Sequence, residues 1–202
     1  MRKFIAGIIF ALIIVAVLIA GALYSGIIDF RADVPVNRWE QRIAEHAAEA
    51  SVERRAPAVQ NPVSIKDQVL IEGADHYNHH CAVCHGGSAN PISDFHNAFY
   101  PRVPQFLSDP PNDIPEHMLF YITKHGIRWT GMPAWGGTMS DEEIWKVVAF
   151  LSRMENLPPA VEAEWKKLPP PAMGHAHGNT AVQPTAEQKP HSHTPGTREH
   201  KH

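Results

Sequence analysis

The chain has 202 residues, of which 44% are hydrophobic, and a formal net charge of -3. That length is enough for one modest domain with additional segments. The near-neutral charge argues against a nucleic-acid-binding protein, because such proteins usually carry a basic excess. The two cysteines exclude a disulfide-rich scaffold and a four-cysteine zinc or iron–sulfur site. The 14 histidines are the unusual feature, since histidine is the commonest metal ligand.

Residues 1–28 are predicted to form a transmembrane anchor. Residues 4–24 are an unbroken apolar run, which at about 1.5 Å per residue matches the roughly 30 Å hydrocarbon core of a bilayer. Arg2 and Lys3 favour a cytoplasmic N-terminus, which places the rest of the chain across the membrane. The run is longer than the apolar region of most signal peptides. Cleavage stays the alternative, because the Ala-Gly-Ala sequence at 20–22 has the small-x-small pattern.

Residues 29–63 are predicted to be an amphipathic connector helix, over 36–55, followed by a linker. Charges of alternating sign lie on one face of this helix. The other face is an apolar stripe at helical spacing, formed by Trp39, Ile43, Ala47 and Ala50. We expect the stripe to pack on the following domain and Pro57 to end the helix.

Residues 64–158 are predicted to form an all-α domain, because no stretch alternates convincingly as a strand. The first helix is expected to begin at Ser64, where Asp67 three residues later resembles a capping box. The segment 85–115 is rich in Pro, Asn, Ser and Asp and is predicted to be mostly loop. Loops of this length need something other than their own side chains to pack on.

Two more helices are predicted in the same domain. The middle one covers 115–125 and is ended by Gly126. The last one has Ser140 as its N-cap and Glu143 at its third position, which is the capping-box pattern. Its apolar residues between 144 and 151 are expected to form a buried stripe.

Residues 159–202 are predicted to be a disordered tail, because many prolines break any periodicity and large apolar residues are few. Three His-x-His pairs lie in it: His175 and His177, His191 and His193, His200 and His202. Imidazoles suit Cu, Ni and Zn, so metal binding is one interpretation. A solvated tail without a dedicated ligand is the equally weighted alternative.

Cys81, Cys84 and His85 form the Cys-x-x-Cys-His signature of covalent haem c attachment. Two thiols three residues apart lie on one side of a turn, where they can form thioether bonds to the two haem vinyl groups. The histidine that follows can then ligate the iron. A thioredoxin-like redox pair would need a βαβ context, and a zinc site would need a second ligand pair. Two ordinary buried cysteines are the remaining alternative.

Further motifs accompany this signature: Gly73, Tyr77, Lys124-His125-Gly126, Gly131-Met132-Pro133-Ala134-Trp135 and the helix at 144–151. With them, residues 64–158 resemble class I c-type cytochromes of the membrane-anchored bacterial kind. They resemble in particular the haem domains of the diheme subunits of cbb3-type oxidases. A single Cys-x-x-Cys-His departs from the diheme pattern, so one covalent haem c is expected.

The resemblance implies that Met132 is the second axial ligand of the iron, opposite His85. Met132 lies in a Gly- and Pro-rich loop, where no helix dictates the direction of the thioether. The resemblance also implies that the first and last helices cross at Gly73. It further implies that a loop proline accepts a hydrogen bond from His85, with three candidates left open: Pro91, Pro101 and Pro104. Candidates for haem packing or propionate contacts are Arg102, Arg128, Trp129 and Trp135.

Ligation by His and Met fills both axial positions, which predicts one-electron transfer and no catalysis. We expect a carrier in a respiratory or related redox chain, in the inner (cytoplasmic) membrane of a bacterium, with its haem domain in the periplasm. Residues 64–158 carry 6 Lys and Arg against 11 Asp and Glu, a net charge of -5. This predicts docking to basic patches on donor and acceptor proteins. Two alternatives are a cytochrome subunit of a larger membrane oxidoreductase, and a haem sensor from which Met132 detaches to admit a ligand.

Overall fold

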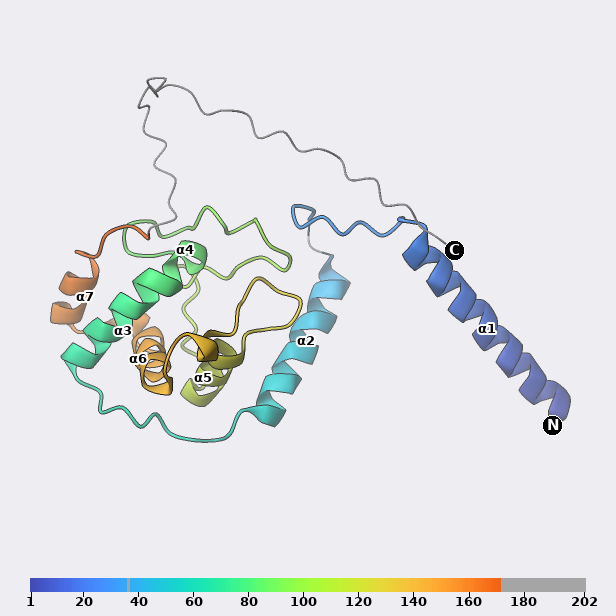
Figure 1. Ribbon diagram of the computed structural model, residues 1–202, viewed down its shortest axis with the longest axis horizontal. Coiled ribbons are helices and arrows are strands. Elements are labelled where there is room, and N and C mark those ends of the chain that lie inside the picture. The colour runs from blue at the N-terminus through green and yellow to red at the C-terminus, as the bar shows by residue number, and fades with distance from the viewer. Residues whose placement is uncertain (36, 172–202) are drawn as a thin grey trace, which may run out of the picture.

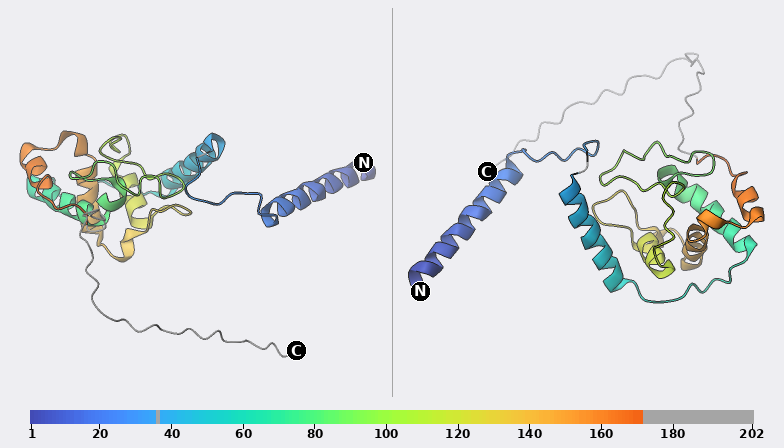
Figure 2. Two further views of the ribbon diagram at one scale, coloured as in Figure 1. Left: turned by 90° about the horizontal axis from the view of Figure 1, so that it is seen from above. Right: turned by 180° about the vertical axis from the view of Figure 1, so that it is seen from behind.

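The computed structural model describes residues 1–35 and 37–171. In these residues every regular element is a helix and there is no strand, which confirms the predicted all-α class. Helix α1 (Arg2–Tyr24) stands apart from the other helices in each view (Figures 1 and 2). None of its residues is buried, and it is long and apolar enough to cross a membrane. It therefore fits the predicted anchor.

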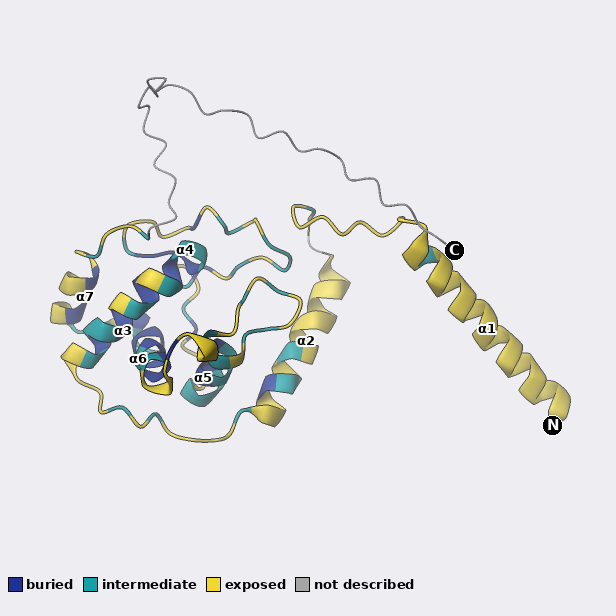
Figure 3. Cartoon of the chain, in the orientation of Figure 1, coloured by how far each residue is buried: buried dark blue, intermediate teal, exposed yellow. Residues whose placement is uncertain are grey.

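Helix α2 (Arg38–Arg55) is the predicted connector helix. It begins where the Trp39 N–H donates a hydrogen bond to the Asn37 side chain, and it ends just before Pro57. The expected packing of its apolar stripe is wrong, because Trp39 is 72% exposed and Ile43 is 69% exposed. Figure 3 shows most of α2 coloured as exposed.

The opposite face of α2 contacts the domain instead. Val52 is the buried residue of this helix, and α2 packs against α5 (Glu116–His125). Ala48 and Ser51 flank Val52 on that face, and their small side chains allow the two helices to approach. Near the start of α2, the Tyr100 hydroxyl donates a 2.7 Å hydrogen bond to Glu40.

Two crossed helices, α3 (Asp67–His80) and α6 (Asp141–Leu151), form the centre of the domain. Gly73 lies where they meet: a Cβ atom added there would be 2.2 Å from the Lys146 carbonyl oxygen and 3.1 Å from the Phe150 Cβ. The structure thus confirms Gly73 as the contact point. No other residue type leaves room for the backbone of α6 at this distance.

Helix α3 begins three residues later than expected, and the predicted capping box of Ser64 and Asp67 is absent. Its N-cap is Lys66, whose backbone is extended and whose side chain makes no capping bond. Upstream, the Val63 N–H donates a 3.0 Å hydrogen bond to the Asn61 side chain. Residues 64–66 are not helical and the Lys66 backbone is extended, so the helix begins only at Asp67 and Ser64 does not cap it.

The other predicted helix ends agree with the structure. Helix α5 follows Pro115 and ends at Gly126, whose φ of +65° lies in the left-handed region that favours glycine. The N-cap Ser140 of α6 and Glu143 form the reciprocal capping box. The end of α5 and the start of α6 were each predicted from residues that lie within one turn of that helix end.

The predicted boundary of the tail at residue 159 is wrong. Helix α7 (Pro159–Trp165) packs against α3, with Val161 fully buried and Trp165 only 6% exposed. The Trp165 ring meets Phe150 edge-on at 5.1 Å between centroids. Proline is compatible with the first turn of a helix, where its missing N–H would have no partner anyway. Pro159 therefore begins a helix here and does not signal disorder.

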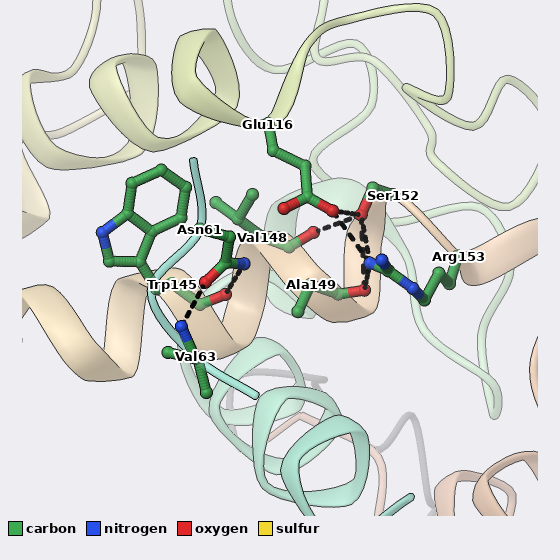
Figure 4. A network of polar contacts seen from close by, with 8 residues as sticks. All are labelled: Asn61, Val63, Glu116, Trp145, Val148, Ala149, Ser152 and Arg153. Atoms are coloured by element: carbon green, nitrogen blue, oxygen red, sulfur yellow. Dashed lines mark hydrogen bonds and ion pairs between the residues drawn. The ribbon is translucent and has the colours of Figure 1, made fainter. Parts of the chain in front are cut away.

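A polar network joins the start of α5 to the end of α6 (Figure 4). The Glu116 carboxylate accepts hydrogen bonds from Arg153 and from the Ser152 hydroxyl, each 2.9 Å long. Burial disfavours the charged form of Glu116. The hydrogen bonds from Arg153, Ser152 and Asn61 outweigh that effect, and the pKa of the carboxyl lies below its ordinary value. The charged form is therefore the one that the fold stabilises.

Replacing Gly73 with alanine should lower the free energy of unfolding. Alanine is the better helix former by about 1 kcal/mol, but overpacking a helix crossing typically costs about 1–3 kcal/mol or more. Gly137→Ala is the matched control, because a Cβ added there meets nothing within 4 Å. Urea denaturation of the two variants measures the difference. Equal stability of G73A and G137A would contradict the close crossing.

Acid should weaken the α5–α6 junction through Glu116. Its pKa is lowered in the folded state, so the stabilisation is fully present above the ordinary carboxyl range and is lost as the pH falls through the folded pKa. Glu116→Gln should therefore reduce stability near neutral pH and leave a smaller acid-dependent loss. Melting temperatures measured from pH 7 to pH 3 test this, with Glu49→Gln at an exposed position of α2 as the control. Parallel curves for E116Q and the unmodified protein would refute the assignment.

Candidate functional site

The Cys-x-x-Cys-His motif occupies a tight turn at the end of α3. Cys81 is the C-cap of α3, and the single-turn helix α4 (Ala82–His85) follows at once. The Cys84 N–H donates a 3.0 Å hydrogen bond to the Cys81 carbonyl, which closes the turn between the two thiols. The crossing of α3 with α6 therefore also fixes where this turn lies.

Neither cysteine forms a disulfide, and Cys81 is buried while Cys84 is half-buried. Burial raises the pKa of the Cys81 thiol to about 12 and also raises the pKa of Cys84. Reactive redox cysteines have lowered pKa values, because the thiolate is the nucleophile. The environment of this pair is therefore unlike that of a thioredoxin-type redox pair.

His85 is a buried imidazole with one nitrogen already engaged. Its Nδ1 lies 2.9 Å from the Pro104 carbonyl oxygen, so Pro104 is the proline that supports it. Because a carbonyl can only accept, Nδ1 carries the proton and Nε2 keeps its lone pair. Burial lowers the pKa of His85, although the bond to Pro104 opposes this shift. A neutral imidazole with a free Nε2 is the form that ligates a metal.

Two residues beside Pro104 help to orient His85, and the sequence analysis missed both. The Phe106 ring stacks on the imidazole, with centroids 4.3 Å apart and planes 4° apart. The buried Gln105 side chain donates to the Cys84 carbonyl at 3.0 Å and accepts from the Ser93 N–H at 2.7 Å. The only signal for Gln105 and Phe106 in the sequence was their position directly after Pro104, one of the three candidate prolines.

The loop with Met132 is held by its own backbone. The Met132 N–H donates a 3.1 Å hydrogen bond to the Thr130 hydroxyl, and the Met132 carbonyl accepts one of 3.2 Å from the Ile127 N–H. A Cβ added at Gly131 would lie 2.7 Å from the Phe99 ring, so this loop also packs closely on Phe99. The half-buried Met132 side chain is thus carried by a fixed turn.

Two other methionines of the domain, Met118 and Met139, are placed differently. Met139 is buried in the core, next to the N-cap of α6. Met118 lies within α5, where the helix sets its direction. Of the three methionines, Met132 is the one whose side chain extends from a loop that lies close to the candidate site.

Trp135 connects the methionine loop to the cysteine turn. It begins the short 3-10 helix η1 (Trp135–Gly137), and its ring lies 5.2 Å from that of His80, which immediately precedes Cys81. The two segments of the candidate site are therefore brought together, although about 50 residues separate them in sequence. Arg128 is exposed, and Trp129 is exposed with a φ of +62°.

These residues fit a covalently bound haem. Two sheltered thiols lie on one turn, a neutral imidazole presents Nε2, and a thioether lies on a neighbouring loop. Imidazole and thioether together are a known axial ligand pair for haem iron. The bond from Nδ1 to a backbone carbonyl is the kind of support that sets the orientation of metal-bound histidines.

The family model described as cytochrome c oxidase, cbb3-type, subunit III matches residues 68–151. These residues form a cbb3-type class I c-type cytochrome domain. The match runs from α3 to the end of α6, less than half of the chain, and leaves out α1, α2 and α7. No curated protein matches the chain. The chemistry of the cytochrome domain is haem c electron transfer, in a form related to that of cbb3-type oxidases.

No group of three or more His, Cys, Asp or Glu side chains placed to hold a metal ion is found in residues 1–35 and 37–171. The predicted copper, nickel or zinc ligands lie outside these residues: His175, His177, His191, His193, His200 and His202. Their role stays a prediction.

Proposed function

We propose that the chain binds one haem c through thioether bonds to Cys81 and Cys84, with His85 and Met132 as the axial ligands. Its role is one-electron transfer at the outer surface of the inner membrane of a bacterium, in a respiratory or related redox chain. The observation that carries this proposal is the bond between His85 Nδ1 and Pro104 on a Cys-x-x-Cys-His turn. That bond fixes the imidazole in the tautomer that an axial ligand needs.

The number of haems follows from the cysteine count. The chain has two cysteines, and each covalent haem c of this kind uses two. With Cys81 and Cys84 both used, no thiol is left for a second attachment or for a disulfide.

Each protein group has a separate task in this proposal. The two cysteines keep the haem attached, Pro104 and Phe106 orient His85, and the turn at 127–132 presents Met132. A haem with both axial positions filled exchanges electrons and offers no vacant site to a substrate. No proton or atom has to move in the step, so the protein needs only to hold its ligands rigid.

The charge of the domain indicates the kind of redox partner. A net charge of -5 over residues 64–158 favours transient docking to basic patches. Exposed carboxylates lie at the start of α6, where Asp141 pairs with Lys124 and Glu142 with Lys146. Electrostatic steering of this sort weakens as salt rises.

Substituting Met132 tests the axial ligand. In Met132→Ala the oxidised protein should lose the long-wavelength charge-transfer band of the Fe–S(Met) bond. Its reduction potential should fall by on the order of 100 mV or more, because axial ligands set potentials over a wide range. Absorption spectra and redox titration measure both effects. Met118→Ala and Met139→Ala are the matched controls and should keep the band.

Two outcomes would contradict the assignment. Loss of the band in M118A or M139A would move the ligand to that methionine. Absence of the band from the unmodified oxidised protein would favour the sensor alternative, in which Met132 does not stay on the iron.

A second candidate function is a subunit of a larger membrane oxidoreductase. It is favoured by the description of the matching family as an oxidase subunit. Native electrophoresis of membranes solubilised in mild detergent separates the two candidates. A free carrier should migrate at the size of the chain with its detergent, whereas a subunit should co-migrate with a large complex that has its own haem or metal spectrum.

A further inference from the structure

Helix α2 has two faces, and the domain uses only one of them. The inner face contacts the domain through Val52. At the side of the helix, near its start, Glu40 accepts a hydrogen bond from Tyr100 of the domain. The other face, here called the outer face, consists of Trp39, Ile43, Ala47 and Ala50. All four of these residues are exposed. At 100° per residue, Ile43 lies about 180° around the helix from Val52.

The outer face is within reach of the membrane that α1 crosses. Residues 25–37 join α1 to α2, and thirteen residues can span at most about 45 Å. Figures 1 and 2 show α2 on the side of the domain nearest α1. The segment between them exposes further apolar side chains: Ile27, Ile28 and Phe30. Apolar side chains therefore also occur between the membrane span and α2, among the charged residues Asp29, Arg31 and Asp33.

The polar residues around the outer face suit a lipid headgroup region. The Arg42 guanidinium lies 5.8 Å from the centre of the Trp39 ring. Arg54 is only about 20° from Ile43 around the helix axis. Trp with neighbouring Arg is the composition found at membrane interfaces, where the ring is half-immersed and the guanidinium meets phosphate. Glu40 and Glu53 border the same face, so binding depends on the apolar side chains more than on net charge.

The size of the outer face favours lipid over a protein partner. A stable protein interface buries about 800 Å² on each side, whereas this face has two large side chains and two alanines. A membrane-bound chain needs far less, because its anchor keeps α2 at high effective concentration near the bilayer. Weak partitioning of an amphipathic helix is then enough to keep it at the surface.

We propose that the outer face of α2 lies in the headgroup region of the bilayer that α1 spans. The helix is then a spacer with lipid on one side and the cytochrome domain on the other. Because Val52 on the inner face and Glu40 at the side of the helix hold α2 on the domain, the lipid contact sets the orientation of the domain relative to the membrane. The proposal depends on α1 as an anchor and does not depend on the haem ligands.

Photocrosslinking in intact membranes tests this contact on the full chain. A p-benzoylphenylalanine residue replaces Ile43 in one variant and Trp39 in a second, both on the outer face. The matched control carries it at Glu45, an exposed position about 200° around the helix from Ile43. After irradiation, mass spectrometry of the α2 peptide detects added phospholipid, and denaturing gels detect protein adducts.

The expected result is a phospholipid adduct at both outer-face positions, several-fold more abundant than at position 45. A protein adduct at position 43 in place of lipid would overturn the proposal in favour of a partner subunit. A crosslinked dimer would overturn it in favour of a second copy of this chain. Equal or undetectable lipid adducts at all three positions would also overturn it, since α2 would then lie away from the bilayer.

Discussion

The close crossing of α3 and α6 at Gly73 is the constraint on which the rest of the domain depends. It brings the backbone of α6 so near that a single added carbon would clash with the Lys146 carbonyl. Because Cys81 caps α3, the same crossing determines where the cysteine turn begins. The site is thus placed by rigid helices, although most of its ligands and supports lie in loops.

The long loops around the site are ordered by side chains that reach back to the cysteine turn. Gln105 bonds to the Cys84 carbonyl, Phe106 stacks on His85, and Pro104 accepts from Nδ1. A loop of this length without helices of its own needs such contacts. Three consecutive residues therefore convert an irregular segment into the support of His85, the proposed iron ligand.

Most features encoded within one turn of sequence could be predicted, although the capping box expected at Ser64 and Asp67 is absent. Most features that need three-dimensional partners could not, apart from the helix crossing at Gly73, which the resemblance to c-type cytochromes implied. The capping box of Ser140 and the Cys-x-x-Cys-His motif are local, so their residues specify them directly. The choice of Pro104 among three prolines depends on how the loop folds over His85. The stripe at Trp39 had the right periodicity for packing, but periodicity does not say which face of a helix meets the domain. Pro159 was misjudged because proline both breaks helices and begins them.

The contacts of the last described segment bear on how the domain completes its folding during synthesis. Asn78 in α3 donates a hydrogen bond to the Pro169 carbonyl, 91 positions later, and Ser88 donates to the Trp165 carbonyl. Helix α7 also packs on α3 and contributes Val161 and Trp165 to the core. Contacts between such distant residues slow folding, since a large loop must close first. The surface of α3, the first helix of the cytochrome domain, is therefore covered only after α7 and the residues up to Pro169 have been synthesised.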